Sequence, residues 1–333
     1  MKKRLFLIIC SMFFVILTAC TTGQTMPISQ TGFYFDTVIT ITLYDSSDKT
    51  LLDSCFKLAD YYEEIFSKTA TNSDVYRINN SNGMPTEVSP ETIELLSVAL
   101  QYSELTNGIV DPTIGGVSAL WDFHKQDSVS ESDTGSATLQ TPPEHSLITD
   151  ALSHVDYTKI QISDNTVTLT DPYTNIDLGF IAKGYIADRI KDFLISEGVT
   201  SAIINLGGNV LTIGSKPDSS AFNIGIQKPF AETGTAITVV PSSDCSVVTS
   251  GIYERYFNYG DKLYHHILNT KTGYPVETDL LGVTIISDNS MDGDALSTAC
   301  LALGFTNALE LINSLEGIEA LFITTDGEIH TTY

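Results

Sequence analysis

The sequence predicts an α+β protein in which mixed β-sheets pack against helices. Two observations support this class. Apolar residues recur at helical spacing in segments such as 49–66 and 186–194. From residue 155 onward, short extended runs alternate with turns, so strands dominate that part of the chain. The sequence shows no internal repeat, and its length is sufficient for one large domain or two.

Residues 1–19 have the features of a secretory signal peptide. A basic start precedes an apolar run that ends in Leu17-Thr18-Ala19-Cys20. This ending resembles the lipobox of bacterial lipoproteins, which implies cleavage before Cys20 and lipidation of its thiol. We therefore expect an extracytoplasmic protein anchored by lipid to the cell membrane, with a flexible tether at 20–31 and a folded domain at 32–333. The alternative is an uncleaved anchor helix, for which the apolar run is short.

The composition restricts the possible partners. The chain has 17 Lys and Arg against 41 Asp and Glu, a net charge of −24. Loss of residues 1–19 removes three cations and no anions, so the mature charge is 14 minus 41, or −27. This charge argues against nucleic acid and against electrostatic docking on anionic lipid. It is compatible with a divalent cation that bridges the protein to an anionic ligand.

The cysteines that remain beyond Cys20 do not predict a metal site. Cys55, Cys245 and Cys300 lie in apolar sequence and lack the spacing of metal ligands. Buried free thiols are therefore expected, rather than a disulfide framework.

The first structured segments alternate between strand and helix. A strand is predicted over Phe33–Tyr44, where apolar and polar residues alternate, and an amphipathic helix over Lys49–Phe66. A second helix is predicted from Ser89, as N-cap before a proline, to about Glu104. Trp121 stands just before a Ser-, Asp-, Thr- and Gly-rich segment at 125–144, which predicts a surface loop. Trp121 is either a core residue or a ligand-facing one.

Strands account for most of the later chain. They are predicted at 159–162, 167–170, 202–206, 210–213, 222–226, 236–240, 246–250, 264–268, 281–287 and 320–324, with a last short strand at the end. Adjacent residues of a strand face opposite ways, so His265 and His266 cannot both serve one site. One of them is expected to be structural, which disfavours a two-histidine metal site.

The segment Asp177–Tyr185 is the first candidate site. An apolar extended run leads into it and a helical pattern leaves it, so a short loop with a glycine at each end joins strand to helix. Such a loop lets backbone approach a ligand, and Lys183 with the helix N-terminus suits an anion. An ordinary tight turn is the alternative. The pattern matches neither the phosphate-binding loop nor the dinucleotide-binding glycine motif.

The second candidate site is the small-residue helix at 292–300. Asp294 and Thr298 are four residues apart, so both side-chain oxygens lie on one helix face. A carboxylate and a hydroxyl one turn apart suit Mg²⁺. In the alternative interpretation both groups act locally: Asp294 stabilises the helix N-terminus and Thr298 bonds back to the helix.

Several motifs together resemble signatures of the ApbE family, the FAD:protein FMN transferases. These motifs are Glu64-Ile65-Phe66-Ser67, Asp111-Pro112-Thr113-Ile114-Gly115, 177–185, Asn205-Leu206-Gly207-Gly208-Asn209, 249–255, 266–275 and 294–299. They occur in family order, and the resemblance covers nearly the whole mature chain.

The resemblance implies a T-fold-like ApbE architecture that binds FAD and Mg²⁺. It implies transfer of FMN from FAD to a threonine or serine hydroxyl of a target flavoprotein, with release of AMP. Asp294 and Thr298 would bind the metal through side chains, and Phe180 and Met291 through backbone carbonyls. FAD would contact Phe35, Ala119, Leu120, Trp121, Asp177, Lys183, His266 and Ile267.

The chain departs from the family pattern in two places. Phe35-Asp36-Thr37 stands where many members have Met-Gly-Thr, and Phe180 stands where a smaller residue is common. Asp294 and His266 would be the catalytic residues, with His266 as base or orienter of the attacking hydroxyl, because an unperturbed imidazole has a suitable pKa.

Three other functions remain open from the sequence. An FAD pyrophosphatase on the same scaffold would use water in place of the protein hydroxyl. A non-enzymatic flavin-binding lipoprotein would need neither the metal positions nor the histidine. A carboxylate-pair hydrolase is permitted by the abundant Asp and Glu, but no spacing selects a pair.

Overall fold

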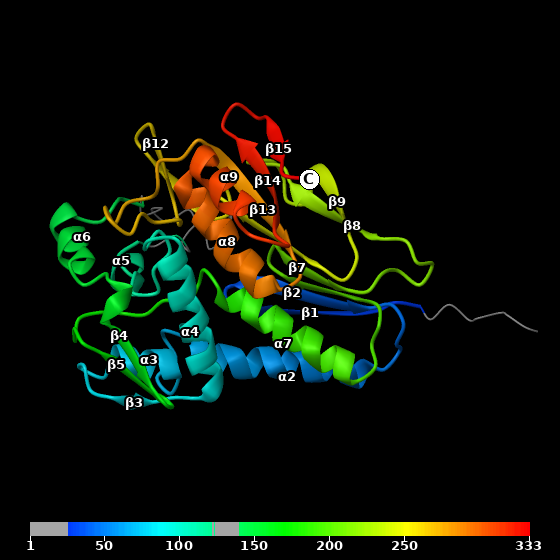
Figure 1. The fold of residues 1–333 in the computed structure, drawn as a ribbon, viewed down its shortest axis with the longest axis horizontal. Coiled ribbons are helices and arrows are strands. Elements are labelled where there is room, and N and C mark those ends of the chain that lie inside the picture. Colours follow the sequence, from blue (N-terminus) through cyan, green and yellow to red (C-terminus); the bar gives the residue numbers. More distant parts are fainter. Residues whose placement is uncertain (1–25, 122, 124–139) are drawn as a thin grey trace, which may run out of the picture.

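A computed structural model describes residues 26–121, 123 and 140–333 (Figure 1). Within these residues the main element is an eight-stranded sheet in which each strand is antiparallel to its neighbours. Its strand order is β1 (Ile28–Tyr34), β2 (Thr37–Leu43), β6 (Ala202–Leu206), β7 (Asn209–Ile213), β10 (Ser246–Gly251), β13 (Leu280–Ser287), β14 (Glu319–Thr324) and β15 (Ile329–Thr331). The predicted α+β class is confirmed.

Helices cover one face of this sheet. They are α2 (Lys49–Phe66), α7 (Ala182–Ser196), α8 (Ser290–Leu303) and α9 (Phe305–Asn313), while α4 (Pro90–Leu105) packs against α8 beside the sheet. On α2 the spacing of Leu52, Cys55, Ala59, Tyr62 and Phe66 gives one apolar stripe, which is buried in the main core. Asp48 caps α2 and Ser89 caps α4, each through a side-chain oxygen that accepts a backbone N–H.

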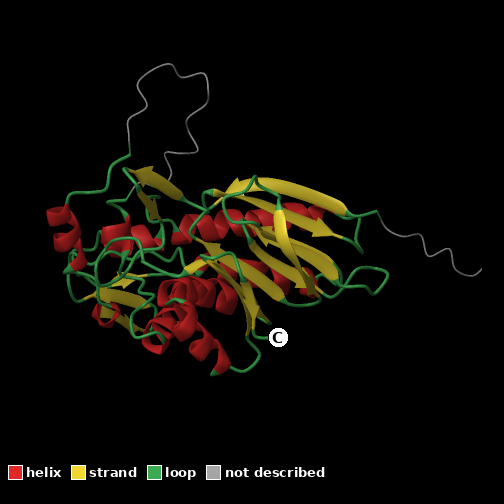
Figure 2. Ribbon diagram, turned by 90° about the horizontal axis from the view of Figure 1, so that it is seen from above, coloured by secondary structure: helices red, strands yellow, loops and turns green. Residues whose placement is uncertain are grey.

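Smaller elements complete the fold. A hairpin of β8 (Phe222–Gln227) and β9 (Ala236–Ser242) packs on apolar residues of the main sheet that do not face the helices. Toward the other end of the molecule lie a three-stranded sheet of β3 (Thr86–Glu87), β5 (Thr166–Leu169) and β4 (Ile160–Ser163), and a hairpin of β11 (Tyr256–Tyr259) and β12 (Lys262–His265) (Figures 1 and 2). The short helices are α3 (Asp74–Asn79), α5 (Gly115–Ser118), α6 (His145–Leu152) and the 3-10 helix Tyr157–Lys159.

The predicted first strand is instead a hairpin. β1 and β2 are joined by a two-residue turn at Phe35 and Asp36, whose φ angles are 53° and 56°. β1 begins at Ile28, so the predicted tether at 20–31 includes strand residues and the folded domain starts before residue 32. Cross-strand hydrogen bonds between hydroxyls hold this early part of β1 on β2, including one of 2.9 Å between Ser29 and Thr42.

The segment before α7 also differs from the prediction. β5 ends at Leu169, and no strand leads directly into Asp177. The helix begins at Ala182, because the carbonyl of its N-cap, Ile181, accepts the Tyr185 N–H at 3.2 Å, and Lys183 therefore lies in the first helical turn instead of a loop.

Other predictions concern residues that are described only in part. The predicted signal peptide and Cys20 lie outside the described residues, as does most of the loop at 125–144; residues 140–143 are described and form neither helix nor strand. Cys55, Cys245 and Cys300 are free thiols. Of the helices that the structure describes, none is both long and apolar enough to cross a membrane.

Candidate functional site

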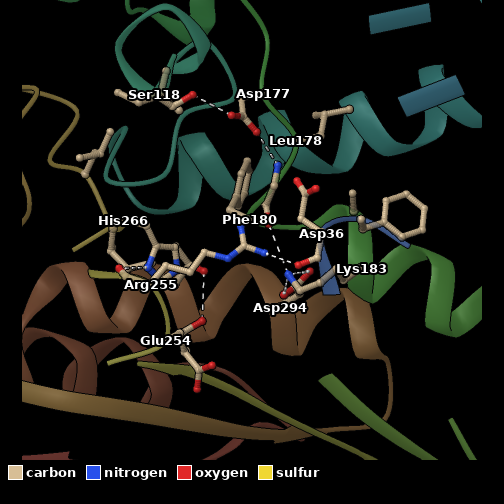
Figure 3. A pocket seen from close by; sticks show the side chains of 18 of the residues that line it. Asp36, Ser118, Asp177, Leu178, Phe180, Lys183, Glu254, Arg255, His266 and Asp294 are labelled. Atoms are coloured by element: carbon tan, nitrogen blue, oxygen red, sulfur yellow. Dashed lines mark hydrogen bonds and ion pairs between the residues drawn. The ribbon is translucent and has the colours of Figure 1, made fainter. Parts of the chain in front are cut away.

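A cavity of about 620 Å³ lies where α7 and α8 meet the turn between β1 and β2 and the β10–β12 region (Figure 3). Segments that are distant in sequence meet here, including the ends of α2 and β10 and the segment before α7. The cavity brings together most of the site residues predicted from the sequence: Phe35, Trp121, Asp177, Phe180, Lys183, His266, Ile267, Asp294 and Thr298.

Asp294 is held rigidly at the junction of α7 and α8. Its side chain is 4% exposed, and the Gly184 N–H donates to Oδ2 at 3.0 Å. Lys183 Nζ lies 3.0 Å from Oδ1. Thr298 follows one turn later on α8 and also lines the cavity, with its hydroxyl 3.3 Å from Ser250 Oγ. The predicted placement of both oxygens on one helix face is confirmed.

Asp188 fixes the start of α8 against α7. Its carboxylate accepts the N–H groups of Ser290 and Met291 at 2.8 and 2.9 Å. Burial raises the pKa of Asp188 to about 6, while these two hydrogen bonds oppose that shift. Met291 itself packs against the main core and is not among the described residues that line the cavity, so its predicted carbonyl contact with a metal stays a prediction.

Asp177 forms a second polar centre in the cavity. Its Oδ2 accepts from Lys68 Nζ at 2.7 Å and from Ser118 Oγ at 2.8 Å, and its Oδ1 accepts the Gly179 N–H at 2.9 Å. Burial alone would raise the pKa of Asp177, but the Lys68 charge and these hydrogen bonds hold it below its ordinary value. The carboxylate is therefore ionised.

The two adjacent histidines have different surroundings, as predicted, but the strand predicted at 264–268 is wrong in its bounds, because β12 ends at His265 and His266 lies in the bend that follows. His265 is 4% exposed and its Nε2 lies 3.1 Å from the Val276 carbonyl, which makes it a structural residue. His266 lines the cavity, with Nδ1 3.2 Å from the Arg255 carbonyl. A carbonyl can only accept, so Nδ1 carries the proton and Nε2 is the free acceptor.

The pKa of His266 does not have the ordinary value expected from the sequence. Burial, followed by the nearby charge of Arg255, lowers its pKa to about 3. The imidazole is therefore neutral at physiological pH. It is a good hydrogen-bond acceptor and a weaker base than an unperturbed histidine.

Comparison with known proteins shows the family of the chain. The model of the ApbE family matches residues 35–322. The chain belongs to the ApbE family. Its curated relatives named FAD:protein FMN transferase include one from Klebsiella pneumoniae, 35% identical and covering 87% of each chain, and one from Treponema pallidum, 31% identical and covering 84% of this chain and 79% of the relative. The crystal structure of an ApbE protein from Thermotoga maritima matches with a TM-score of 0.80 and 30% identity, covering 92% of this chain and 96% of that one.

The FAD contacts that the ApbE resemblance implies for Ala119, Leu120 and Trp121 stay predictions, and only Trp121 is among the described residues that line the cavity. Trp121 is buried, donates from Nε1 to the Gly273 carbonyl at 2.9 Å and packs among aromatic rings, so it is a core residue at the cavity wall. Ala119 is exposed and Leu120 packs beside the same cluster; neither is among the described residues that line the cavity.

Several cavity residues were not anticipated individually. Lys68 directly follows the family motif at 64–67, and Arg255 ends the motif at 249–255, so the sequence next to each residue pointed to this site. Glu63 Oε1 accepts the Phe35 N–H at 2.7 Å, and Arg255 Nη2 donates to the Asp36 carbonyl at 3.3 Å. These two contacts hold the left-handed turn at Phe35 and Asp36 at the cavity edge. Figure 3 shows the Arg255 side chain extending toward Asp36.

The described lining of the cavity has more carboxylates than cations, so an anionic ligand would bind better together with a metal cation. This described lining has six carboxylates (Asp36, Glu63, Asp111, Asp177, Glu254, Asp294) and three cations (Lys68, Lys183, Arg255). No three His, Cys, Asp or Glu side chains gather as a metal site within the described ranges. A metal beside Asp294 would therefore use one carboxylate and a hydroxyl together with other oxygens. That set fits Mg²⁺, which commonly binds one or two carboxylates plus substrate phosphates.

Proposed function

We propose that this chain transfers FMN from FAD to a threonine or serine hydroxyl of a target flavoprotein and releases AMP. The observation that carries the proposal is one cavity that is lined by the Asp294–Lys183 ion pair, by Thr298 and by His266, whose Nε2 is the free acceptor. The names of the curated relatives support the same reaction.

The reaction exchanges the phosphoanhydride bond of the FAD pyrophosphate for a phosphoester bond to the acceptor. The acceptor hydroxyl oxygen forms a bond to the phosphorus of the FMN half of FAD. The bond from that phosphorus to the bridging oxygen breaks, and AMP leaves with the bridging oxygen. The hydroxyl proton passes to an acceptor at the site or to solvent. Such a transfer depends mainly on positioning and on neutralising charge.

The residues of this chain supply both contributions. Lys183 and Lys68 provide positive charge in a cavity that is otherwise rich in carboxylates, and the N-terminus of α7 adds the positive end of its helix dipole. Asp294, Thr298 and the Phe180 carbonyl, with that of Met291, would hold Mg²⁺. Bound there, Mg²⁺ would neutralise charge on the pyrophosphate and its leaving group.

His266 is best suited to orient the acceptor hydroxyl. Because Nδ1–H is committed to the Arg255 carbonyl, Nε2 can accept a hydrogen bond from the hydroxyl and direct its oxygen toward phosphorus. With its pKa lowered to about 3, the imidazole stays neutral throughout the physiological range. It would therefore align the nucleophile more than it would raise the concentration of alkoxide.

The test measures both products in one reaction. The chain without residues 1–20 is mixed with FAD, Mg²⁺ and a candidate flavoprotein acceptor, and the intact mass of the acceptor is followed together with AMP. A mass gain equal to FMN, with equimolar AMP, is expected. AMP with free FMN and an unchanged acceptor, over a panel of acceptors, would indicate an FAD pyrophosphatase instead. Neither product, with FAD still bound, would favour a flavin-binding protein.

We also propose that the protein is extracytoplasmic and lipid-anchored through Cys20. The proposal rests on the basic start, the apolar run and the Leu17–Cys20 pattern. The expected result is membrane-associated wild-type protein that incorporates labelled fatty acid, whereas a Cys20→Ser variant does neither. Equal labelling of both proteins would contradict the proposal.

A further inference from the structure

The ammonium group of Lys183 occupies a position made of oxygen atoms. Its Nζ lies 3.0 and 3.4 Å from the two carboxylate oxygens of Asp294 and 3.4 Å from the Gly179 carbonyl. These oxygens come from the same two elements that the ApbE resemblance implies hold the metal, namely the segment around Phe180 and the first turns of α8. A metal cation bound beside Asp294 would therefore compete with the Lys183 ammonium group for the same oxygens.

The two partners of this ion pair differ in mobility. Asp294 is 4% exposed and its Oδ2 is fixed by the Gly184 N–H, so the carboxylate keeps its place when Lys183 leaves. The Lys183 side chain is 26% exposed, lines the cavity, and can rotate into it on a flexible stem. The carboxylate is therefore a fixed acceptor and the ammonium group a movable cation.

We infer that Lys183 is an exchangeable counter-ion of Asp294 that makes metal binding depend on the nucleotide. Without nucleotide, its ammonium group neutralises Asp294 and disfavours a divalent cation beside it. When the pyrophosphate of a dinucleotide enters the cavity, Lys183 moves from Asp294 to the phosphate oxygens, and Asp294 becomes available to the metal. The inference rests on the proposed function only for the identity of the nucleotide, FAD.

The physical basis is repulsion between two cations that share one buried carboxylate. Charges a few ångströms apart in a partly buried site interact strongly, so the exchange should change metal affinity by about tenfold or more. Binding linkage is reciprocal, and the nucleotide and the metal must therefore strengthen each other's binding by the same factor. An enzyme built this way would not hold the metal tightly before its substrate arrives.

The test measures Mn²⁺ binding to the protein without nucleotide, by electron paramagnetic resonance of free Mn²⁺. Lys183→Met removes the charge and is expected to tighten Mn²⁺ binding about tenfold. Lys183→Arg keeps the charge and should bind Mn²⁺ as weakly as wild type. Lys68→Met is the matched control, because it removes a cation of the same cavity that pairs with Asp177 instead of Asp294, and less than a twofold change is expected. Adding Asp294→Asn to Lys183→Met should abolish the gain.

The outcomes are separable from those of the proposed function. The inference is overturned if Lys183→Met binds Mn²⁺ no more tightly than wild type while its circular dichroism and melting temperature match wild type. It is also overturned if Lys68→Met produces an equal gain. FMN transfer is not needed for this measurement, so failure of the transferase assay leaves the Mn²⁺ result interpretable.

Discussion

Lys68 Nζ lies 2.7 Å from Oδ2 of Asp177, an ion pair that joins residues 109 positions apart. Lys68 follows the end of α2, whereas Asp177 lies in the segment before α7. The same carboxylate oxygen accepts the Ser118 hydroxyl. Three separate segments are thereby fixed around one wall of the cavity, and the charge of Asp177 is balanced at the place where an anionic ligand would enter.

Replacing Lys68 by Met should weaken FAD binding about tenfold with little loss of stability. The cavity already has more carboxylates than cations, and removing one cation leaves Asp177 to repel the pyrophosphate. Lys68 is 44% exposed, so the ion pair itself stabilises the fold by about 1 kcal/mol at most. Flavin fluorescence titration and thermal melting measure the two effects. Lys216→Met, outside the described cavity lining, serves as the control. Equal FAD affinity in wild type, Lys68→Met and Lys216→Met would contradict the prediction.

Replacing His266 by Ala should lower the rate of FMN transfer at saturating FAD and Mg²⁺ by roughly 100-fold or more, because the hydroxyl loses its acceptor. Wild-type turnover should show no inflection near pH 6.5 from this residue, since its pKa is about 3. The measurement is kcat between pH 5.5 and 8.5 for both proteins.

His154→Ala is the control for His266, because His154 pairs with Asp171 at 2.7 Å and does not line the cavity. Near-normal turnover of His266→Ala would remove the histidine from the mechanism. A wild-type inflection near pH 6.5 that disappears in His266→Ala would show that the imidazole titrates as an ordinary base.

Local patterns predicted the regular elements well. The bounds of α2 and β6 match the prediction, because the apolar residues within each segment recur at the spacing of a helix or of a strand. The Asp294–Thr298 face follows from helix geometry in the same way. The different surroundings of His265 and His266 do not follow from strand geometry, because β12 ends at His265 and His266 lies in the bend after it.

The missed features depend on contacts between distant segments. Phe and Asp rarely adopt positive φ, so the turn at Phe35 and Asp36 has no local signal; it is held by Glu63 and Arg255 from elsewhere in the chain. The position of Lys68 opposite Asp177 likewise requires the packing of α2 against α7. A tertiary contact of this kind cannot be read from spacing within one segment.

Replacing Gly184 by Ala should destabilise the protein and disturb the metal face. A Cβ atom at Gly184 would lie 2.4 Å from the Ser290 carbonyl oxygen and 2.5 Å from Met291 Cα, so α7 and α8 would have to separate. Overpacking of this kind costs roughly 1–3 kcal/mol, and it would also move Lys183 relative to Asp294. Urea unfolding measures the first effect and transfer activity the second.

Gly116→Ala is the matched control for Gly184→Ala. A Cβ atom there would have its nearest neighbour at 3.7 Å, an ordinary contact, so stability should change by less than about 0.5 kcal/mol. If Gly184→Ala were as stable and active as Gly116→Ala, the close approach of α7 and α8 would not be required for the site.

Replacing His265 by Gln should reduce the loss of stability in mild acid. Burial lowers the pKa of His265 to about 4, against about 6.5 in the unfolded chain. Between these values the unfolded state binds more protons, so the stabilisation is present above pH 6.5 and is lost as the pH falls toward 4. The shift corresponds to a loss of about 2 kcal/mol between pH 7 and pH 5 that the Gln variant would lack. Asp188, with its raised pKa, acts in the opposite direction, but it does so in both proteins and cancels in the comparison.

Urea unfolding at pH 7 and pH 5 measures the difference, with His330→Gln on the exposed strand β15 as control. Parallel pH dependence in wild type and His265→Gln would mean that His265 does not resist protonation in the folded protein.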